Sequence, residues 1–318
     1  MAEVSSAVIV VNGGNIIQAE FSDLYVRANE PDMLISILGS GAERMFNITV
    51  ENVNPSLTII NGSVPGSIKN GSNHVSFTTM VAPRLVKTIT LTPAENLENF
   101  TFVVLGDGRD NPDIFQQILT DGASFNPLFI IILGDMVNSG NREEYDELVI
   151  LMEASSAPVL TMPGNHDIKN SGREYYSQIF GTYYHSFDVG STHFILLDNA
   201  KGAVDNAQME WLRQDLEQNN ASSILVFMHI PPFDPRPDQN YAMTDTNNSQ
   251  DLVSLFEQFQ VDMVFSGHIH SYLQETRNGV HYVITGGGGA PLVQDLPGHH
   301  YVLMNVSNEN ITKQIFLV

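Results

Sequence analysis

The sequence predicts an α/β domain that follows a small all-β domain, and three observations lead to this prediction. Short β-type runs separated by turn residues fill roughly the first hundred positions. After Phe100, strongly apolar runs alternate with amphipathic helical patterns, which is typical of an α/β fold. The composition changes between Thr92 and Asn99, so we expect domains over residues 1–97 and 98–318.

The N-terminal part shows no helical period, and its short runs are bounded by Gly, Asn, Pro and Ser. This spacing predicts a small antiparallel β-sandwich. The expected strands cover Ala7 to Val11, Met33 to Leu38, Phe46 to Val50, Leu57 to Ile60, Val75 to Thr79 and Lys87 to Leu91.

The C-terminal part contains three runs that are too apolar for a strand with one wet face. They are Phe100 to Leu105, Leu128 to Leu133 and Ile224 to Met228, and they predict buried parallel strands. Helices are expected between the strands, where apolar residues recur at helical spacing. These helices cover Pro112 to Thr120 with a cap at Asn111, Glu143 to Glu153, Ala207 to Gln218, and Gln250 to Phe259 with a start at Ser249.

Residues that bind metals well follow the ends of the strand-like runs. They are Gly106-Asp107, Gly134-Asp135, Gly164-Asn165-His166-Asp167, His229 and Gly267-His268-Ile269-His270. In an open α/β sheet, functional groups gather beyond the carboxyl ends of the strands, so these side chains can converge although they are distant in sequence. We therefore expect a metal cluster at this edge.

The donor chemistry indicates which metal fits the cluster. Carboxylates, an amide oxygen and imidazoles without thiolate suit Mn, Fe or Zn. Asp135 is expected to bridge two divalent cations, an arrangement that supports attack of a metal-bound hydroxide on phosphorus. His166 is expected to protonate the leaving oxygen, and Asp167 to hold the His166 ring in its tautomer.

The ordered set of Gly-Asp, Gly-Asp, Gly-Asn-His-Asp, His and Gly-His-x-His resembles the calcineurin-like metallophosphoesterase family, from about Phe100 to the C terminus. The resemblance implies two β-sheets packed as a layered sandwich and flanked by helices. It also implies a first metal held by Asp107, Asp135 and His270, a second held by Asp135, Asn165, His229 and His268, and His166 as the catalytic histidine. Purple acid phosphatases share the preceding β-sandwich, but their metal-ligand Tyr is absent after Asp135.

The sequence departs from this family at Arg109, which stands where the Asp-x-His motif has its histidine. A guanidinium is always protonated and cannot coordinate a metal. Three interpretations follow: a weaker first metal site, a clamp on the substrate phosphate, or a one-metal or inactive relative. We favour a working enzyme with a weakened first site, because every other position of the set is present. A plain salt bridge to Asp110 is the structural alternative to phosphate binding.

Composition limits the partners. Fourteen basic against 36 acidic residues give a net charge of −22. An acidic surface repels nucleic acid, so we expect small phosphomonoesters or phosphodiesters as substrates and no nucleic-acid partner. The competing hypothesis is a non-catalytic surface binding protein with a degenerate one-metal phosphoesterase domain; Arg109 favours it, and His166 opposes it. The oligomeric state cannot be predicted.

Two further segments and the cellular location complete the expectations. Gly286 to Gly289 is expected to bring backbone close to the site, whereas contact of His299-His300 with the site stays open. The chain has no cysteine and no apolar run long enough for a membrane span. Eight Asn-x-Ser/Thr sequences favour an exported or cell-surface mature form over a cytoplasmic protein.

Overall fold

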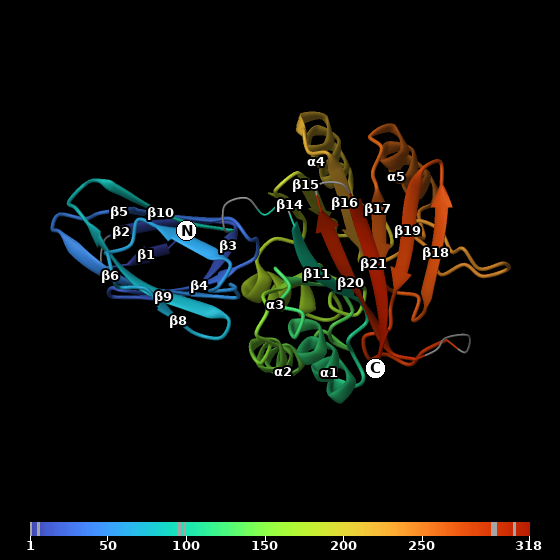
Figure 1. The fold of residues 1–318 in the computed structure, drawn as a ribbon, viewed down its shortest axis with the longest axis horizontal. Coiled ribbons are helices and arrows are strands. Elements are labelled where there is room, and N and C mark those ends of the chain that lie inside the picture. Colours follow the sequence, from blue (N-terminus) through green and yellow to red (C-terminus); the bar gives the residue numbers. More distant parts are fainter. Residues whose placement is uncertain (1, 5–6, 94–96, 98, 294–297, 308–309) are drawn as a thin grey trace.

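The computed structural model describes residues 2–4, 7–93, 97, 99–293, 298–307 and 310–318. The described residues between 2 and 93 form an all-β sandwich, and those between 99 and 317 form a layered α/β sandwich beside it (Figure 1). The predicted fold class is confirmed. The predicted boundary between residues 97 and 98 stays a prediction, because residues 94–96 and 98 lie outside the described part.

The N-terminal sandwich packs two sheets face to face, and alternate residues such as Ile9, Ile35, Ile48 and Phe77 fill the space between them. The first sheet has the order β1-β2-β5-β10-β7, formed by Ala2–Val4, Ala7–Asn12, Met33–Leu38, Val86–Pro93 and Thr58–Asn61. The second has the order β3-β4-β6-β9-β8, formed by Gly14–Glu20, Asp23–Ala28, Arg44–Glu51, His74–Val81 and Lys69–Asn70.

The expectation of a wholly antiparallel sandwich is wrong at one position. Strands β4 and β6 pair in parallel, with Leu24 opposite Ile48. After β4, the chain crosses to the other sheet to form β5 and then returns to the second sheet, where it forms β6 beside β4. This crossover between the sheets gives the two strands the same direction.

The C-terminal sandwich also contains two sheets. The first has the order β13-β12-β11-β20-β21, formed by Val159–Thr161, Ile130–Ile132, Asn99–Leu105, His300–Ser307 and Asn310–Leu317. The second has the order β14-β15-β16-β17-β19-β18, formed by His185–Val189, Thr192–Leu196, Ser223–Met228, Met263–Ser266, Val280–Thr285 and Tyr272–Arg277. Strands β11, β12 and β13 are parallel, as are β15, β16, β17 and β19.

Aromatic side chains fill the space between these two sheets. The Phe102 ring lies 5.3 Å from Phe194 and 6.1 Å from Phe227, measured between centroids. Helices α1 (Pro112–Ala123), α2 (Arg142–Glu153) and α3 (Gly172–Phe180) cover the outer face of the first sheet, and α4 (Asn206–Gln218) and α5 (Thr246–Gln258) cover that of the second (Figure 1). None of the helices in the described residues is long and apolar enough to cross a membrane.

Two helix starts test the capping predictions. Helix α1 begins at Pro112, and the Asn111 side chain accepts a hydrogen bond from the Ile114 N–H at 3.2 Å, as predicted. Helix α5 begins at Thr246 rather than Gln250, because the Asp245 carboxylate caps it by accepting from the N–H groups of Asn247 and Asn248. Helix α3 was not predicted.

The N-terminal sandwich contacts the edge of the first C-terminal sheet. The Asn52 side chain accepts a hydrogen bond from the Val159 N–H at 2.6 Å and donates to the Val159 carbonyl at 2.9 Å. It also donates to the Ala28 carbonyl at 2.7 Å. Val159 begins β13, an edge strand, so the Asn52 amide takes the place of a neighbouring strand there.

Candidate metal centre

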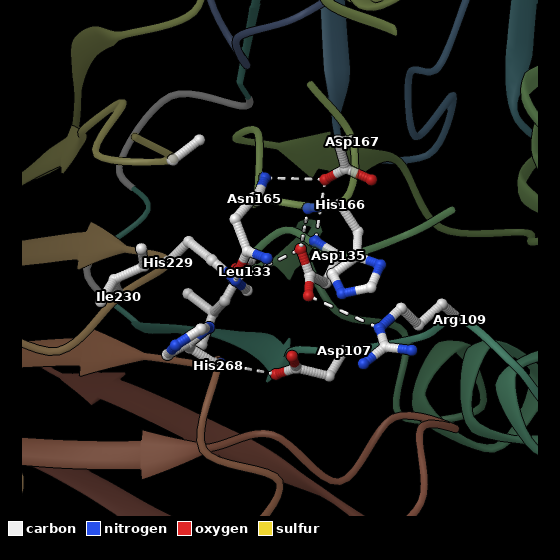
Figure 2. Close-up of polar contacts among 12 residues, drawn as sticks. Asp107, Arg109, Leu133, Asp135, Asn165, His166, Asp167, His229, Ile230 and His268 are labelled. Carbon is white, nitrogen blue, oxygen red and sulfur yellow. Dashed lines mark hydrogen bonds and ion pairs between the residues drawn. The ribbon is translucent and has the colours of Figure 1, made fainter. Parts of the chain in front are cut away.

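The structure brings the expected polar residues together at the carboxyl ends of five strands. Asp107, Asp135 and Asn165 follow β11, β12 and β13, while His229 and His268 follow β16 and β17 (Figure 2). Two of these loops are bonded directly: the Asp107 N–H donates to the Gly134 carbonyl at 3.0 Å, and the Arg109 N–H donates to the Asp135 carbonyl at 3.1 Å. The parallel strands therefore fix the separations of the side chains.

One group of donors is close enough to hold a single ion. Ligand atoms of Asp135, His229 and His268 lie within 4.8 Å of one another. The Asn165 side-chain oxygen lies 3.0 Å from His229 Nε2, and Asp135 Oδ1 lies 3.3 Å from the same nitrogen. We call these four residues, Asp135, Asn165, His229 and His268, the four-donor set.

The orientation of His229 is fixed by its backbone contacts. Its Nδ1 lies 2.7 Å from the Leu133 carbonyl, which can only accept, so Nδ1 carries the hydrogen and Nε2 faces the set. The Asn199 side-chain oxygen accepts hydrogen bonds from the His229 and Ile230 N–H groups, both at 3.0 Å. Asn199 was not predicted, although it follows the apolar strand β15 in the same way as the predicted residues.

The charges of the set are coupled. Burial raises the pKa of Asp135, but the charge and hydrogen bond of His229, together with the backbone N–H and charge of His166, bring this pKa below its ordinary value. Burial lowers the pKa of His229, but the Asp135 and Asp107 carboxylates raise it to about 9. Burial, together with the charge of His229, lowers the pKa of His268 to about 4. A cation bound here would take the Nε2 lone pair of His229 and displace its proton.

A second group of donors lies next to Asp135. Asp107 is fully buried, and its Oδ1 accepts no hydrogen bond within the described residues, although His270 Nε2 lies 3.4 Å away. Asp107 Oδ2 accepts from the His268 N–H at 2.8 Å. The Arg109 guanidinium reaches toward the same place, with Nε 3.5 Å from Asp135 Oδ2 (Figure 2).

Backbone geometry around these donors depends on close approach and on the left-handed conformation. Asp107, Asp135 and His268 have φ values of 61°, 54° and 64°, a region that non-glycine residues seldom adopt. A Cβ added to Gly164 would lie 2.3 Å from Asp135 Oδ1, and one added to Gly267 would lie 2.6 Å from Asp107 Oδ2. Bulkier residues at these two positions would displace the carboxylates.

The glycine-rich segment behaves as expected, whereas the paired histidines are structural. A Cβ on Gly286 would lie 2.7 Å from Asp107 Oδ2, so this loop does bring backbone against the site. His299 Nδ1 lies 3.1 Å from the Gly287 carbonyl, and the buried His300 packs edge-on against Tyr272. Both histidines therefore pack around the Gly286–Gly289 loop and are not among the metal-binding side chains.

His166 lies beside the four-donor set but contacts different partners than predicted. Its N–H donates to Asp135 Oδ1 at 2.8 Å, and its ring Nδ1 lies 2.7 Å from the Asn138 carbonyl. Lys169 Nζ lies 2.8 Å from the same ring nitrogen. Burial lowers the pKa of His166, and the positive charges of Arg109 and Lys169 lower it further. Neither Asn138 nor Lys169 was predicted.

The expectation that Asp167 orients His166 is wrong. The Asp167 carboxylate is fully buried and accepts hydrogen bonds from backbone N–H groups: Oδ2 from Asp135 and Gly164, and Oδ1 from Met136 and Val137, at 2.7–3.0 Å. Both oxygens are therefore used to join the loops that follow β12 and β13, and the Asn138 carbonyl holds the ring instead.

The residues present fit a divalent cation at the four-donor set. Two imidazoles, an amide oxygen and a carboxylate are a borderline N/O set that suits Zn, Mn or Fe. Asp107 lies outside this set, and its buried Oδ1 accepts no hydrogen bond within the described residues. In the group formed by Asp107, Asp135 and His270, the Arg109 guanidinium lies 3.5 Å from Asp135 Oδ2 and 3.4 Å from His270 Nε2.

A layered sandwich with such donors at its strand ends defines a metallophosphoesterase-like domain. The chain belongs to the calcineurin-like phosphoesterase family, whose pattern matches residues 100–272. The predicted family is thereby confirmed, and its members include phosphodiesterases and phosphatases that hydrolyse phosphoesters with divalent metals.

Two curated relatives and one solved structure illustrate the similarity. The chain is 27% identical over 163 residues to a 3',5'-cyclic-nucleotide phosphodiesterase of Nostoc sp., covering 48% of this chain and 60% of that protein. It is 28% identical over 191 residues to the glycerophosphodiester phosphodiesterase GpdQ of Enterobacter lignolyticus, covering 56% and 67%. A purple acid phosphatase from yellow lupin seeds shares the fold, with a TM-score of 0.61, 13% identity and coverage of 96% of this chain and 72% of that chain.

The alignment with the Nostoc protein covers only part of each of the two chains. The chain spans 60% of the length of the Nostoc relative, and the matched segment is about half of the present chain. Whether this chain acts on the same substrates as these relatives is therefore a matter for proposal.

Proposed function

We propose that this protein is a metal-dependent hydrolase of small phosphoesters. The observation that carries the proposal is the four-donor set of Asp135, Asn165, His229 and His268, with His166 beside it. A divalent cation held there would polarise the phosphoryl group and acidify a water molecule. The family membership supports the same reaction class.

The side chains around the set have separate tasks in this proposal. His166 Nδ1 lies within hydrogen-bond reach of the Asn138 carbonyl, and Nε2 is the atom proposed to give a proton to the leaving oxygen, once Lys169 Nζ, now 3.2 Å from Nε2, moves away. Its lowered pKa makes the protonated ring a stronger acid. Arg109 is the group proposed to bind a non-bridging phosphoryl oxygen, because a guanidinium fork matches phosphate geometry.

Phosphodiesters are the substrate class that we place ahead of monoesters. Both curated relatives described above are phosphodiesterases. The net charge of −22 disfavours long polyanionic substrates and supports small ones.

One observation favours a second function, a surface binding protein with a degenerate one-metal domain. Arg109 stands where a metal-binding histidine is expected, so the dinuclear site is incomplete. The placement of His166 opposes this function, since a binding module has no need of a proton donor beside the donor set.

Metal content and turnover separate the two functions. We expect hydrolysis of bis-p-nitrophenyl phosphate to rise with added Mn²⁺ and to exceed that of p-nitrophenyl phosphate. Asp135→Ala should lose bound metal and turnover together, whereas His166→Ala should keep the metal and lose turnover by about 10²-fold or more. A wild-type protein that retains metal and hydrolyses neither ester would contradict the hydrolase proposal and favour the binding function.

We also propose an exported or cell-surface location. Every Asn of the Asn-x-Ser/Thr sequences is exposed, so all of them are open to glycosylation: Asn47, Asn61, Asn70, Asn99, Asn220, Asn247, Asn305 and Asn310. Expression through a eukaryotic secretory pathway should give a protein that loses mass on endoglycosidase treatment. An unchanged mass would contradict the proposal.

A further inference from the structure

Arg109 lies at the position where a second cation would have to bind. Its Nε is 3.5 Å from Asp135 Oδ2, and its Nη2 is 3.4 Å from His270 Nε2. The side chain is 14% exposed, so the guanidinium faces the site rather than solvent (Figure 2).

The atoms that Arg109 faces are the remaining donors of the site. His270 Nδ1 lies 2.8 Å from the Pro291 carbonyl, an acceptor, which leaves Nε2 to point inward. That nitrogen faces both Arg109 Nη2 and Asp107 Oδ1, each at 3.4 Å. A metal ion bound by Asp107 and His270 would need the lone pair toward which the guanidinium N–H is directed.

Arg109 is held in place by several contacts. Its backbone N–H donates to the Asp135 carbonyl at 3.1 Å. Nη1 donates to the Asp110 carboxylate and to the Asn138 side-chain oxygen, the latter at 3.2 Å. Because its backbone N–H and its Nη1 atom are both hydrogen-bonded, the Arg109 side chain cannot leave the site without breaking these bonds.

The charges lead to the same conclusion. The Asp135 carboxylate belongs to the four-donor set and also lies 3.5 Å from the Arg109 guanidinium. A second divalent cation at Asp107 and His270 would lie beside a permanent positive charge, which repels it in a buried site. Among the described residues, the only group of three or more metal-binding side chains gathered tightly enough is that of Asp135, His229 and His268.

We propose that this protein binds a single divalent cation and that the Arg109 guanidinium is the permanent positive charge of the second position. The cation is held by Asp135, Asn165, His229 and His268. Arg109 neutralises Asp135 and presents an N–H group to a non-bridging phosphoryl oxygen. This inference rests on the proposed hydrolase function and specifies its metal requirement.

The test is metal stoichiometry in the full chain. Wild-type protein dialysed against Mn²⁺ should retain one equivalent by plasma mass spectrometry, with the electron paramagnetic resonance signal of isolated Mn²⁺. Arg109→His removes the charge and adds an imidazole, so it should retain two equivalents and show the exchange-coupled signal of a metal pair. Arg142→His is the matched control, because Arg142 is exposed on α2, and it should retain one equivalent.

A second readout covers the phosphate contact. With one equivalent of Mn²⁺ bound, Arg109→Gln should bind inorganic phosphate at least tenfold more weakly than wild type, measured by calorimetry. Circular dichroism verifies that each variant is folded. Two equivalents in wild type, one equivalent in folded Arg109→His, or unchanged phosphate affinity in Arg109→Gln would each overturn the inference. Wild type that binds two equivalents and hydrolyses the diester would overturn the inference alone, whereas metal-loaded wild type without turnover would overturn the proposed function.

Discussion

Replacing Asp167 with asparagine tests how the loops of the metal centre are held. The Asp167 carboxylate is fully buried and accepts four backbone N–H groups. Oδ2 joins Asp135 to Gly164, so one atom ties the loop after β12 to the loop after β13. Asparagine has nearly the same shape but offers one accepting oxygen in place of two.

The size of the effect follows from these contacts. Whichever way the introduced amide is turned, its NH₂ group faces two N–H donors that lose their acceptor. Each buried unsatisfied donor costs about 1–3 kcal/mol, so Asp167→Asn should lower the free energy of unfolding by about 2–6 kcal/mol. That is a large part of the roughly 5–15 kcal/mol by which a typical domain is stable.

Urea unfolding followed by circular dichroism and by the fluorescence of Trp211, the only tryptophan, measures this loss. Asp251→Asn is the control, since Asp251 is exposed on α5 and its replacement should change stability by less than about 0.5 kcal/mol. Metal affinity should fall in the Asp167 variant as well, because the Asp135 backbone loses a partner. A loss of under about 1 kcal/mol in Asp167→Asn would refute the reasoning.

Two further predictions concern stability away from the metal centre. Burial lowers the pKa of His193, but hydrogen bonds and ion pairs with Asp215 and Asp188 outweigh it and raise this pKa. Stability from protonated His193 is therefore present below pH about 6.5 and lost as pH rises through the higher folded pKa. His193→Gln should cost about 1–2 kcal/mol more at pH 5.5 than at pH 8.5, with the exposed His281→Gln measured beside it as the control. Equal losses for His193→Gln at both pH values would contradict the ion pairing. Asn52→Gly removes three hydrogen bonds, while glycine tolerates the observed φ of 61°. Urea unfolding should therefore show that the free energy of unfolding falls by about 2–4 kcal/mol. An unchanged urea midpoint would count against the contact between Asn52 and β13.

The sequence was informative about strand ends and less so about what surrounds them. Gly-Asp and Gly-His-x-His after apolar runs predicted which side chains converge, because parallel strands bring their carboxyl ends to one edge. The role of Asp167 could not be predicted in the same way. Its partners are backbone N–H groups of another loop, and backbone groups have no signature in the sequence.

Similar reasons explain the other differences. The ring of His166 is held by the carbonyl of Asn138, again a backbone group. Both Asp245 and Ser249 are good capping residues, and only the hydrogen bonds in the structure show that Asp245 begins α5. The parallel pairing of β4 and β6 depends on a crossover through the other sheet, which local alternation does not reveal.

The contact between Asn52 and β13 has a practical consequence for work on the catalytic part alone. Strand β13 is the edge of its sheet, and the N-terminal sandwich shields it. A truncated chain that begins at residue 98 would expose the N–H and C=O groups of Val159 as a template for strand addition. Such a fragment should self-associate through this edge. By covering β13, the N-terminal sandwich protects the C-terminal domain against aggregation.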